Sequence, residues 1–170
     1  FFRGWIGGVL MRFTDLMMAF PALLLAICLA AIFQPSLWII ALVIALVNWV
    51  RTARVIFTET SSLATRDFIA AERTLGASTP RILFRHILPN SLAPIIVVGT
   101  TSLATYIVLE ATLSFLGVGL PTTTVSWGGD ISNAQSILRT DPMVLFYPSA
   151  ALAITVLAFI LLGDAVSEAR

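Results

Sequence analysis

The densest group of side chains that could do chemistry in this 170-residue sequence lies in residues 66–90, RDFIAAERTLGASTPRILFRHILPN. This stretch holds four Arg, two acids and His86, the only histidine of the chain. Lipid cannot accommodate so many charges, so binding to a protein surface is the chemistry that they favour. A lone histidine at an interface is more often a structural hydrogen-bonding group than a catalyst. We call residues 66–90 the docking segment.

Glu110 and Asn48 are the polar groups that interrupt otherwise apolar runs. A carboxylate this deep in an apolar helix is costly and by default functional, although Glu110 lies near a helix end, where hydrogen bonding between helices explains it equally well. Packing is the favoured interpretation for Asn48. Together with Thr101 and Thr105 these residues form a candidate translocation path.

Two other classes of function remain open at this point. An ion-coupled carrier or channel could use Glu110 and Asn48 as a polar path, and it would transport without ATP. A membrane-embedded enzyme would need clustered His, Asp or Glu within the spans, and only Glu110 qualifies.

Several chemistries are excluded by residues that the sequence lacks. Cys28 is the single cysteine, so no disulfide or thiolate metal cluster can form within one chain. The sequence has no G-x-x-x-x-G-K-[ST] loop to hold nucleotide phosphates, so ATP hydrolysis by that route requires another subunit. A net charge of +1 is too small to indicate the strongly basic surface of a nucleic-acid-binding protein. We therefore expect no enzyme activity, no bound cofactor and no metal site.

The elements that position these residues are membrane helices. The sequence is 58% hydrophobic and only 11% charged, against about 45–50% and about 25% in soluble domains. We predict an all-α integral membrane protein. Pro21 is tolerated near the start of the first span, and the second span reaches full length if Arg51 and Arg54 snorkel to the interface. The four predicted spans cover residues of about 16–34, 37–57, 92–116 and 143–163.

The distribution of arginine predicts the orientation. Residues 51–86 hold six Arg against three acids, or +3, whereas the loop 117–142 holds one Arg against two acids, or −1. The positive-inside rule puts residues 51–90 in the cytoplasm and the loop 117–142 outside. We expect a short helix at about 126–138 in this external loop.

Start and stop signals predict two helices in the docking segment. Asp67 is expected to cap a helix over 68–75, and Gly76 to take the left-handed conformation after it. Thr79 is expected to cap a second helix with Pro80 at its first position, and Pro89 to stop that helix.

The first of these helices carries a small apolar stripe of Phe68, Ala71 and Leu75. This stripe could dock into a groove on another protein. Alternatively, Phe68 and Leu75 pack back onto the ends of the spans. The pattern leaves both interpretations open.

Several motifs resemble one known family. The sequence A-A-E-R-T-L-G at 70–76, followed after nine residues by H-I-L-P-N at 86–90, resembles the E-A-A…G…I-x-L-P loop of ABC importer permeases, with Ala70 in place of the motif's Glu and Glu72 in place of its second Ala. Three further motifs resemble those of the dipeptide, oligopeptide and nickel subfamily of these permeases. They are M-R-F-T-D…A-F-P at 11–21, L-S-F-L-G-V-G…S-W-G at 113–128 and L-L-G-D at 161–164.

This resemblance implies a type I ABC importer transmembrane domain over residues 1–170 with four of the usual six spans, so that two N-terminal spans are absent. The docking segment would be the cytoplasmic coupling loop, seated on a separate ATPase. The implied ATPase contacts are Ala70, Ala71, Glu72, Arg73, Leu75, Gly76, Ala77 and Ser78. The implied supporting residues are Arg81, Arg85, His86, Leu88 and Pro89.

The resemblance also implies partners and location. ATP and Mg²⁺ would bind to two partner ATP-binding subunits. A second permease subunit would complete a heterodimer, and an extracytoplasmic solute-binding protein would deliver the substrate. The chain would lie in the lipid bilayer of a bacterial or archaeal inner or plasma membrane. Dipeptides or oligopeptides are the implied substrates, with nickel or another small solute as the alternative.

Overall fold

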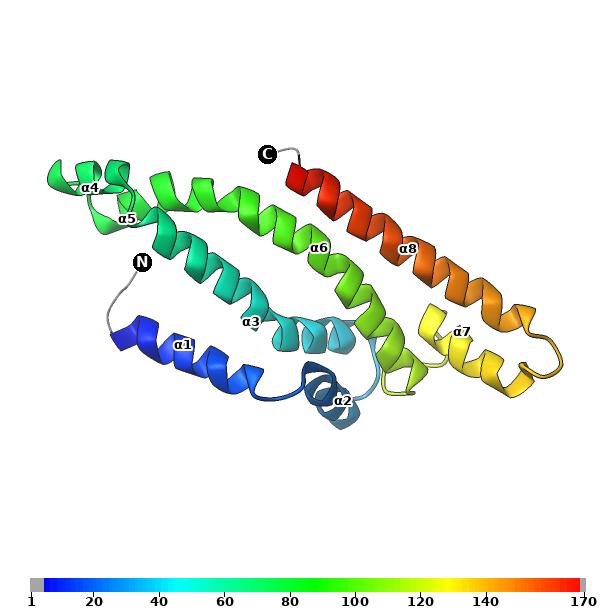
Figure 1. Cartoon of the computed structure of the whole chain (residues 1–170). Helices are drawn as coiled ribbons and strands as arrows, with labels where there is room; N and C mark the ends of the chain where they lie inside the picture. Colours follow the sequence, from blue (N-terminus) through cyan, green and yellow to red (C-terminus); the bar gives the residue numbers. More distant parts are fainter. Residues whose placement is uncertain (1–4, 169–170) are drawn as a thin grey trace. The chain divides into compact units, whose positions relative to one another are not determined.

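The computed structural model describes residues 5–168, and each regular element within that range is a helix (Figure 1). These elements are, in chain order, α1 (Trp5–Met18), α2 (Ala22–Ile32), α3 (Leu37–Leu63), α4 (Asp67–Thr74), α5 (Thr79–Ile82), the π-helical turn η1 (Leu83–Ile87), α6 (Leu88–Phe115), α7 (Trp127–Ala134), the 3₁₀ turn η2 (Gln135–Ile137) and α8 (Met143–Glu168).

Three of the described helices are long and apolar enough to cross a membrane. They cover Leu37–Leu63, Thr79–Phe115 and Met143–Glu168, and a fourth span is present if Gly7–Met18 and Ala22–Ile32 together make one broken span. Within their most apolar windows only 22%, 11% and 6% of the residues are buried. Most of their apolar side chains therefore face outward, as expected of helices surrounded by lipid or by other subunits. The prediction of an all-α membrane protein is confirmed.

The first apolar run is divided between two helices. α1 ends at Met18, and α2 begins at Ala22, directly after Pro21, whose backbone is not helical (φ −59°, ψ 121°). Proline lacks the N–H needed to continue α1, and it also disfavours helical geometry at Phe20 before it. Pro21 therefore lies at the N-cap of α2, whose first bond runs from the Leu25 N–H to the Pro21 carbonyl at 3.0 Å. The membrane boundaries of this and the other predicted spans remain predictions.

The chain divides into two compact units, each with its own small core. One unit comprises Phe1–Ala19 with Trp49–Gly99, and the other comprises Phe20–Asn48 with Thr100–Arg170. The first core consists of Leu63, Ile69, Ile82 and Ile87, and the second of Ala26, Val43, Val47 and Leu113.

The expected stop at Pro89 is wrong, because helix continues from Thr79 to Phe115. The π-helical turn η1 lies just before the proline, and its wider spacing accommodates the missing N–H. Side chains one turn later supply donors to the carbonyls there. Asn90 Nδ2 donates to the His86 carbonyl at 2.6 Å, and Ser91 Oγ donates to the Ile87 carbonyl at 2.9 Å. Asn90 and Ser91 thus stabilise a continuing helix rather than beginning a new one.

The S-W-G motif of residues 126–128 has a structural explanation. Ser126 caps α7, since its Oγ accepts the Gly129 N–H at 3.1 Å. At Gly128 an added Cβ would lie 2.0 Å from the Ala111 carbonyl oxygen, so only glycine permits this approach of α7 to α6. α7 and η2 together match the helix predicted at about 126–138.

Candidate functional site

The docking segment folds as two short helices about one glycine turn. α4 ends at Thr74, and Gly76 follows with φ +82°, as predicted. The Gly76 N–H donates to the Arg73 carbonyl at 3.1 Å, and the Ala77 N–H donates to the Glu72 carbonyl at 3.0 Å. This pair of bonds is the Schellman motif. An added Cβ at Gly76 would have no neighbour within 4 Å, so the positive φ, and not lack of space, requires glycine.

The predicted caps are displaced by one residue. Asp67 is the first residue of α4 and Thr79 the first of α5, while Arg66 and Ser78 occupy the cap positions without side-chain cap bonds. The Asp67 carboxylate therefore lies in the first turn of α4, where it interacts favourably with the positive end of the helix dipole.

The buried side of α4 is Ile69, which sequence reasoning did not single out. Ile69 is fully buried and packs with Leu63, Ile82 and Ile87. The predicted stripe residue Leu75 is 82% exposed. Because Ile69 fixes the rotation of α4, Leu75 points outward, and the interpretation in which it packs back onto the spans is wrong. An exposed leucine between two short helices is available for docking.

A groove of about 410 Å³ lies within the docking segment. Its one acid is Glu72, whose Oε1 lies 3.5 Å from His86 Nε2. Arg81 and Arg85 are exposed and form no ion pair with any residue that the structure describes. The groove is therefore positively charged. All seven lining residues belong to the set expected at the ATPase contact or its support: Glu72, Leu75, Gly76, Ala77, Arg81, Arg85 and His86.

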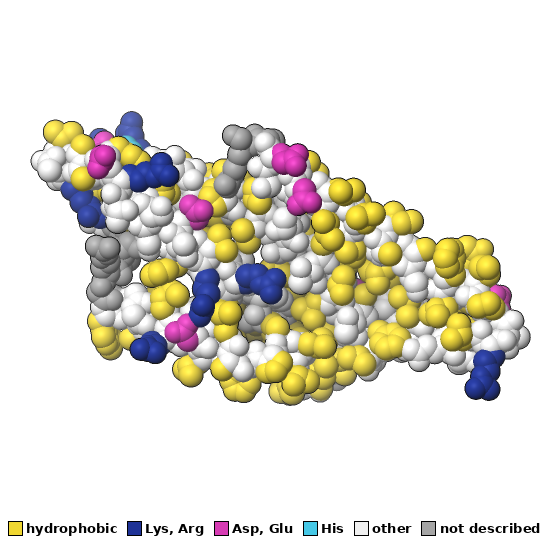
Figure 2. Space-filling model, in the orientation of Figure 1, with side chains coloured by type: hydrophobic (Ala, Val, Ile, Leu, Met, Phe, Trp, Pro, Cys, Tyr) yellow, Lys and Arg dark blue, Asp and Glu magenta, His cyan; other side chains and the backbone are white. Residues whose placement is uncertain are grey.

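The remaining predicted residues of the docking segment lie outside this groove. They are exposed positions on α4, in the turn after it and at the start of α6. These residues are Ala70, Ala71, Arg73, Ser78, Leu88 and Pro89. Figure 2 shows charged side chains gathered over α4 and α5.

Glu110 belongs to a hydrogen-bond chain that closes the end of α6. Ser114 Oγ donates to Glu110 Oε1 at 2.7 Å and accepts the Leu120 N–H at 3.0 Å. Gly117, with φ +79°, makes the reversal between these residues. At Gly119 an added Cβ would lie 2.2 Å from Ser114 Oγ. This bond lies within α6 and not between helices, so the structure gives Glu110 a local partner, and the role of Glu110 stays a prediction.

Two other candidate path residues, Asn48 and Thr101, each have a close neighbour in the structure. Asn48 Nδ2 donates to the Ile44 carbonyl of its own helix at 2.9 Å, which agrees with a packing role. Thr101 lies beneath Gly163, where an added Cβ would come within 2.6 Å of Thr101 Cγ2. Thr105 is exposed. The structure thus gives these residues separate surroundings, and their assignment to a path stays a prediction.

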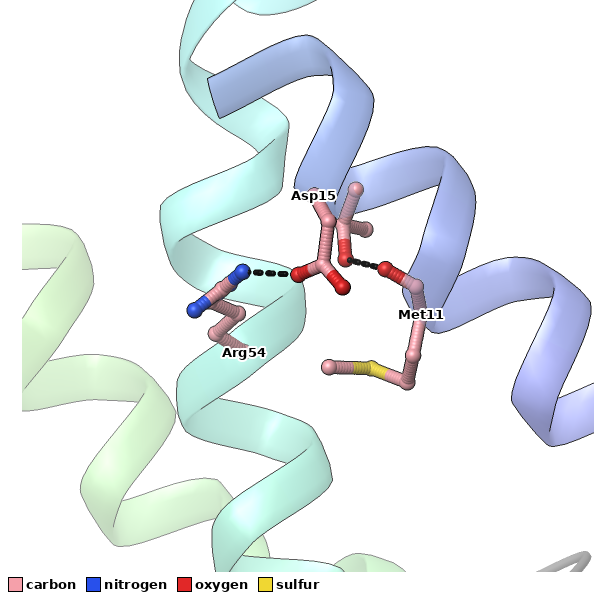
Figure 3. Close-up of polar contacts among 4 residues, drawn as sticks. Met11, Asp15 and Arg54 are labelled. Carbon is pink, nitrogen blue, oxygen red and sulfur yellow. Dashed lines mark hydrogen bonds and ion pairs between the residues drawn. The ribbon is translucent and has the colours of Figure 1, made fainter. Parts of the chain in front are cut away.

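One charged pair was missed by sequence reasoning. The guanidinium of Arg54, a residue expected to snorkel to the interface, donates to Asp15 Oδ1 on α1 (Figure 3). Asp15 ends the M-R-F-T-D motif, which was the one signal that could have pointed to this pair. No spacing rule links residues that lie 39 positions apart.

Comparison with known proteins gives consistent matches over nearly the whole chain. Residues 1–169 match the family described as "Binding-protein-dependent transport system inner membrane component". The chain is 37% identical to a dipeptide transport system permease protein of Alkalihalophilus pseudofirmus over 99% of its length, and 35% identical to an oligopeptide transport system permease protein of Bacillus subtilis over 98%. It is 36% identical to a glutathione transport system permease protein of Escherichia coli over 99%. It spans 56% of the length of each of these relatives.

Proposed function

Since the chain belongs to the family of binding-protein-dependent transport system inner membrane components, we propose that it forms part of the permease subunit of a peptide ABC importer. The named relatives support peptides as the substrate class, because they are permeases for dipeptides, oligopeptides and glutathione. Nickel or another small solute is the alternative substrate. The chain lies in the bacterial inner membrane as a multi-pass protein.

The observation that carries the proposal is the exposed, positively charged docking segment. Leu75 is 82% exposed beside the groove that Arg81 and Arg85 line. A partner with an apolar pocket and acidic side chains would complement both features. We assign this partner role to an ATP-binding subunit, which would hold the ATP and Mg²⁺ that this chain has no motif to bind.

Coupling would follow from the common core of the docking segment. Ile69, Ile82 and Ile87 join α4, α5 and η1 through one core, and η1 runs directly into α6. A displacement of α4 by the ATPase would therefore move the start of α6 as a rigid body. The long helices would then switch between inward-open and outward-open packings.

The remaining partners complete the importer. A second permease subunit would cover apolar helix surfaces that the chain leaves exposed, and an extracytoplasmic solute-binding protein would deliver the substrate at the side of α7. An ion-coupled carrier is the second candidate class, and it is less well supported because Glu110 already accepts the Ser114 hydroxyl.

The experiment that tests the proposal is peptide uptake into proteoliposomes. The full-length permease is reconstituted with its second permease, ATP-binding and solute-binding subunits, and uptake of a labelled dipeptide is measured with ATP inside. We expect uptake that requires ATP and the binding protein. Uptake that persists without ATP and follows an ion gradient would overturn the proposal in favour of a carrier.

A further inference from the structure

Asp15 on α1 and Arg54 on α3 form an ion pair. Arg54 lies in the part of α3 that precedes the docking segment in the sequence. We propose that these residues form a positioning pair, which holds α1 against α3 so that α1 moves together with the docking segment. This inference rests on the proposed function for its consequence, although the pairing itself can be measured independently.

The geometry of Arg54 makes Asp15 its compensating charge. The Arg54 guanidinium donates to Asp15 Oδ1, and the two side chains are 40% and 49% exposed (Figure 3). Arg54 Nε is buried and has no hydrogen-bond partner among the described residues. The inner side of this guanidinium is thus already undersatisfied. Loss of the Asp15 carboxylate would leave the Arg54 guanidinium without its described counter-charge, and because both side chains are partly exposed, we expect this loss to loosen the contact between α1 and α3 rather than to unfold the protein.

A second contact ties the same two helices. The rings of Phe13 on α1 and Trp49 on α3 have centroids 6.0 Å apart. Between Phe13 and Asp15, Thr14 is only 3% exposed, and its hydroxyl donates to the Met11 carbonyl of its own helix at 2.7 Å. The buried face of α1 is therefore satisfied within the helix, and the Asp15–Arg54 pair supplies a charged link across the interface.

These contacts lie in the compact unit that also contains the docking segment. Phe1–Ala19 and Trp49–Gly99 form that unit, so α1, the second half of α3 and the helices α4 and α5 share one body. Arg54 lies on the part of α3 that leads into α4. A displacement of the docking segment would reach α1 through this pair.

The pair also suits the surroundings of α1. Trp5 and Leu16 are 84% and 66% exposed, so this helix presents an apolar outer face. Charge attraction is stronger in surroundings of lower dielectric constant than in water. Exchange of the two charges keeps one cation facing one anion, so it should preserve the link between α1 and α3. Neutralisation of either charge removes the attraction and should weaken that link.

The test uses spin labels in the full-length permease, assembled with its partner subunits in proteoliposomes. Cys28 is first replaced by serine, and labels are attached through Leu16→Cys on α1 and Phe57→Cys on α3, next to the two members of the pair. Asp15→Asn, Arg54→Gln and the exchange Asp15→Arg with Arg54→Asp are compared. Glu59→Gln and Arg51→Gln, at positions on α3 without a described ion pair, are the matched controls.

We expect a narrow label-to-label distance distribution in the parent protein, the controls and the exchange variant, and a broadened one in both single variants. ATP-driven uptake should fall in the single variants and return in the exchange. Unchanged distances in Asp15→Asn and Arg54→Gln would overturn the inference. Broadened distances in the single variants together with ATP-driven uptake at the parent rate would also overturn the inference. Failure of the parent protein to need ATP would overturn the proposed function instead, while the distances would still test the pairing.

Discussion

Glu72 on α4 faces His86 in the π-helical turn η1, with Glu72 Oε1 3.5 Å from His86 Nε2. This contact joins the two halves of the docking segment across the Gly76 turn, and both residues line the positively charged groove. It also accounts for Glu72, which stands where the resembled motif has an alanine. The departure from the motif thus coincides with a contact to a histidine that the motif does not specify.

Replacement of Glu72 by Lys should impair coupling more than folding. Even a charged pair that is partly exposed contributes no more than about 1 kcal/mol to stability, so loss of the contact between Glu72 and His86 should change the unfolding midpoint little. The added cation beside Arg81 and Arg85 should displace His86 and alter the groove, so ATP-driven uptake should fall. The measurement is uptake alongside thermal unfolding, with Glu59→Lys as the control. Equal loss of uptake in both variants would show that the position of Glu72 has no special role.

Gly76 gives a prediction that separates conformation from space. A non-glycine residue in the left-handed region costs about 1–2 kcal/mol, and Asn bears this conformation better than other residues. Since nothing lies within 4 Å of an added Cβ, Gly76→Asn should retain most of the ATPase binding, whereas Gly76→Val should lose it. Affinity for the ATP-binding subunit is the measurement. If both variants bind equally, the turn is not conformationally constrained.

Gly128 should be intolerant of any side chain. An added Cβ would lie 2.0 Å from the Ala111 carbonyl oxygen and 2.7 Å from its carbon, which are backbone atoms that cannot move aside cheaply. Gly128→Ala should therefore detach α7 from α6, at a cost of about 1–3 kcal/mol for overpacking. Proteolysis of the 121–142 region should accelerate. Gly129→Ala is the matched control, because its Cβ would meet only the Ser126 hydroxyl, at 3.0 Å.

Glu110 should tolerate the loss of its charge. Its described partner is the Ser114 hydroxyl, which could donate equally well to the amide oxygen of glutamine. Glu110→Gln should therefore keep uptake close to the parent rate, while Glu110→Leu, which leaves Ser114 without this acceptor, should reduce protein stability. Uptake rate and unfolding midpoint are measured for both. Abolished uptake in a stable Glu110→Gln variant would instead indicate a proton or cation path.

Sequence reasoning succeeded where local rules decide the structure. Gly76 adopts the predicted conformation because a helix that ends in a left-handed residue strongly favours glycine. The long apolar runs predict the membrane helices because hydrophobic length is a local property. All the residues that line the groove were anticipated because the resembled motif marks that loop.

Sequence reasoning failed where the local structure depends on contacts with other residues of the fold. Pro89 was expected to stop a helix, but the helix continues through it after the π-helical turn η1, with additional side-chain bonds from Asn90 and Ser91 to the His86 and Ile87 carbonyls. Ile69 and not Phe68 is buried, because the rotation of α4 is set by Ile82 and Ile87 from later in the chain. The Asp15–Arg54 pair joins two helices whose packing no local pattern specifies.

The central claim is that the basic groove of the docking segment binds the ATP-binding subunit. Co-purification of that subunit with the membrane-inserted permease tests it most directly, using Arg81→Glu with Arg85→Glu and, as the control, Arg139→Glu, which lies in the predicted external loop. We expect the double variant to insert into the membrane normally but to lose the ATP-binding subunit, while Arg139→Glu retains it. Retention of the subunit by the double variant, together with ATP-driven uptake at the parent rate, would contradict the claim.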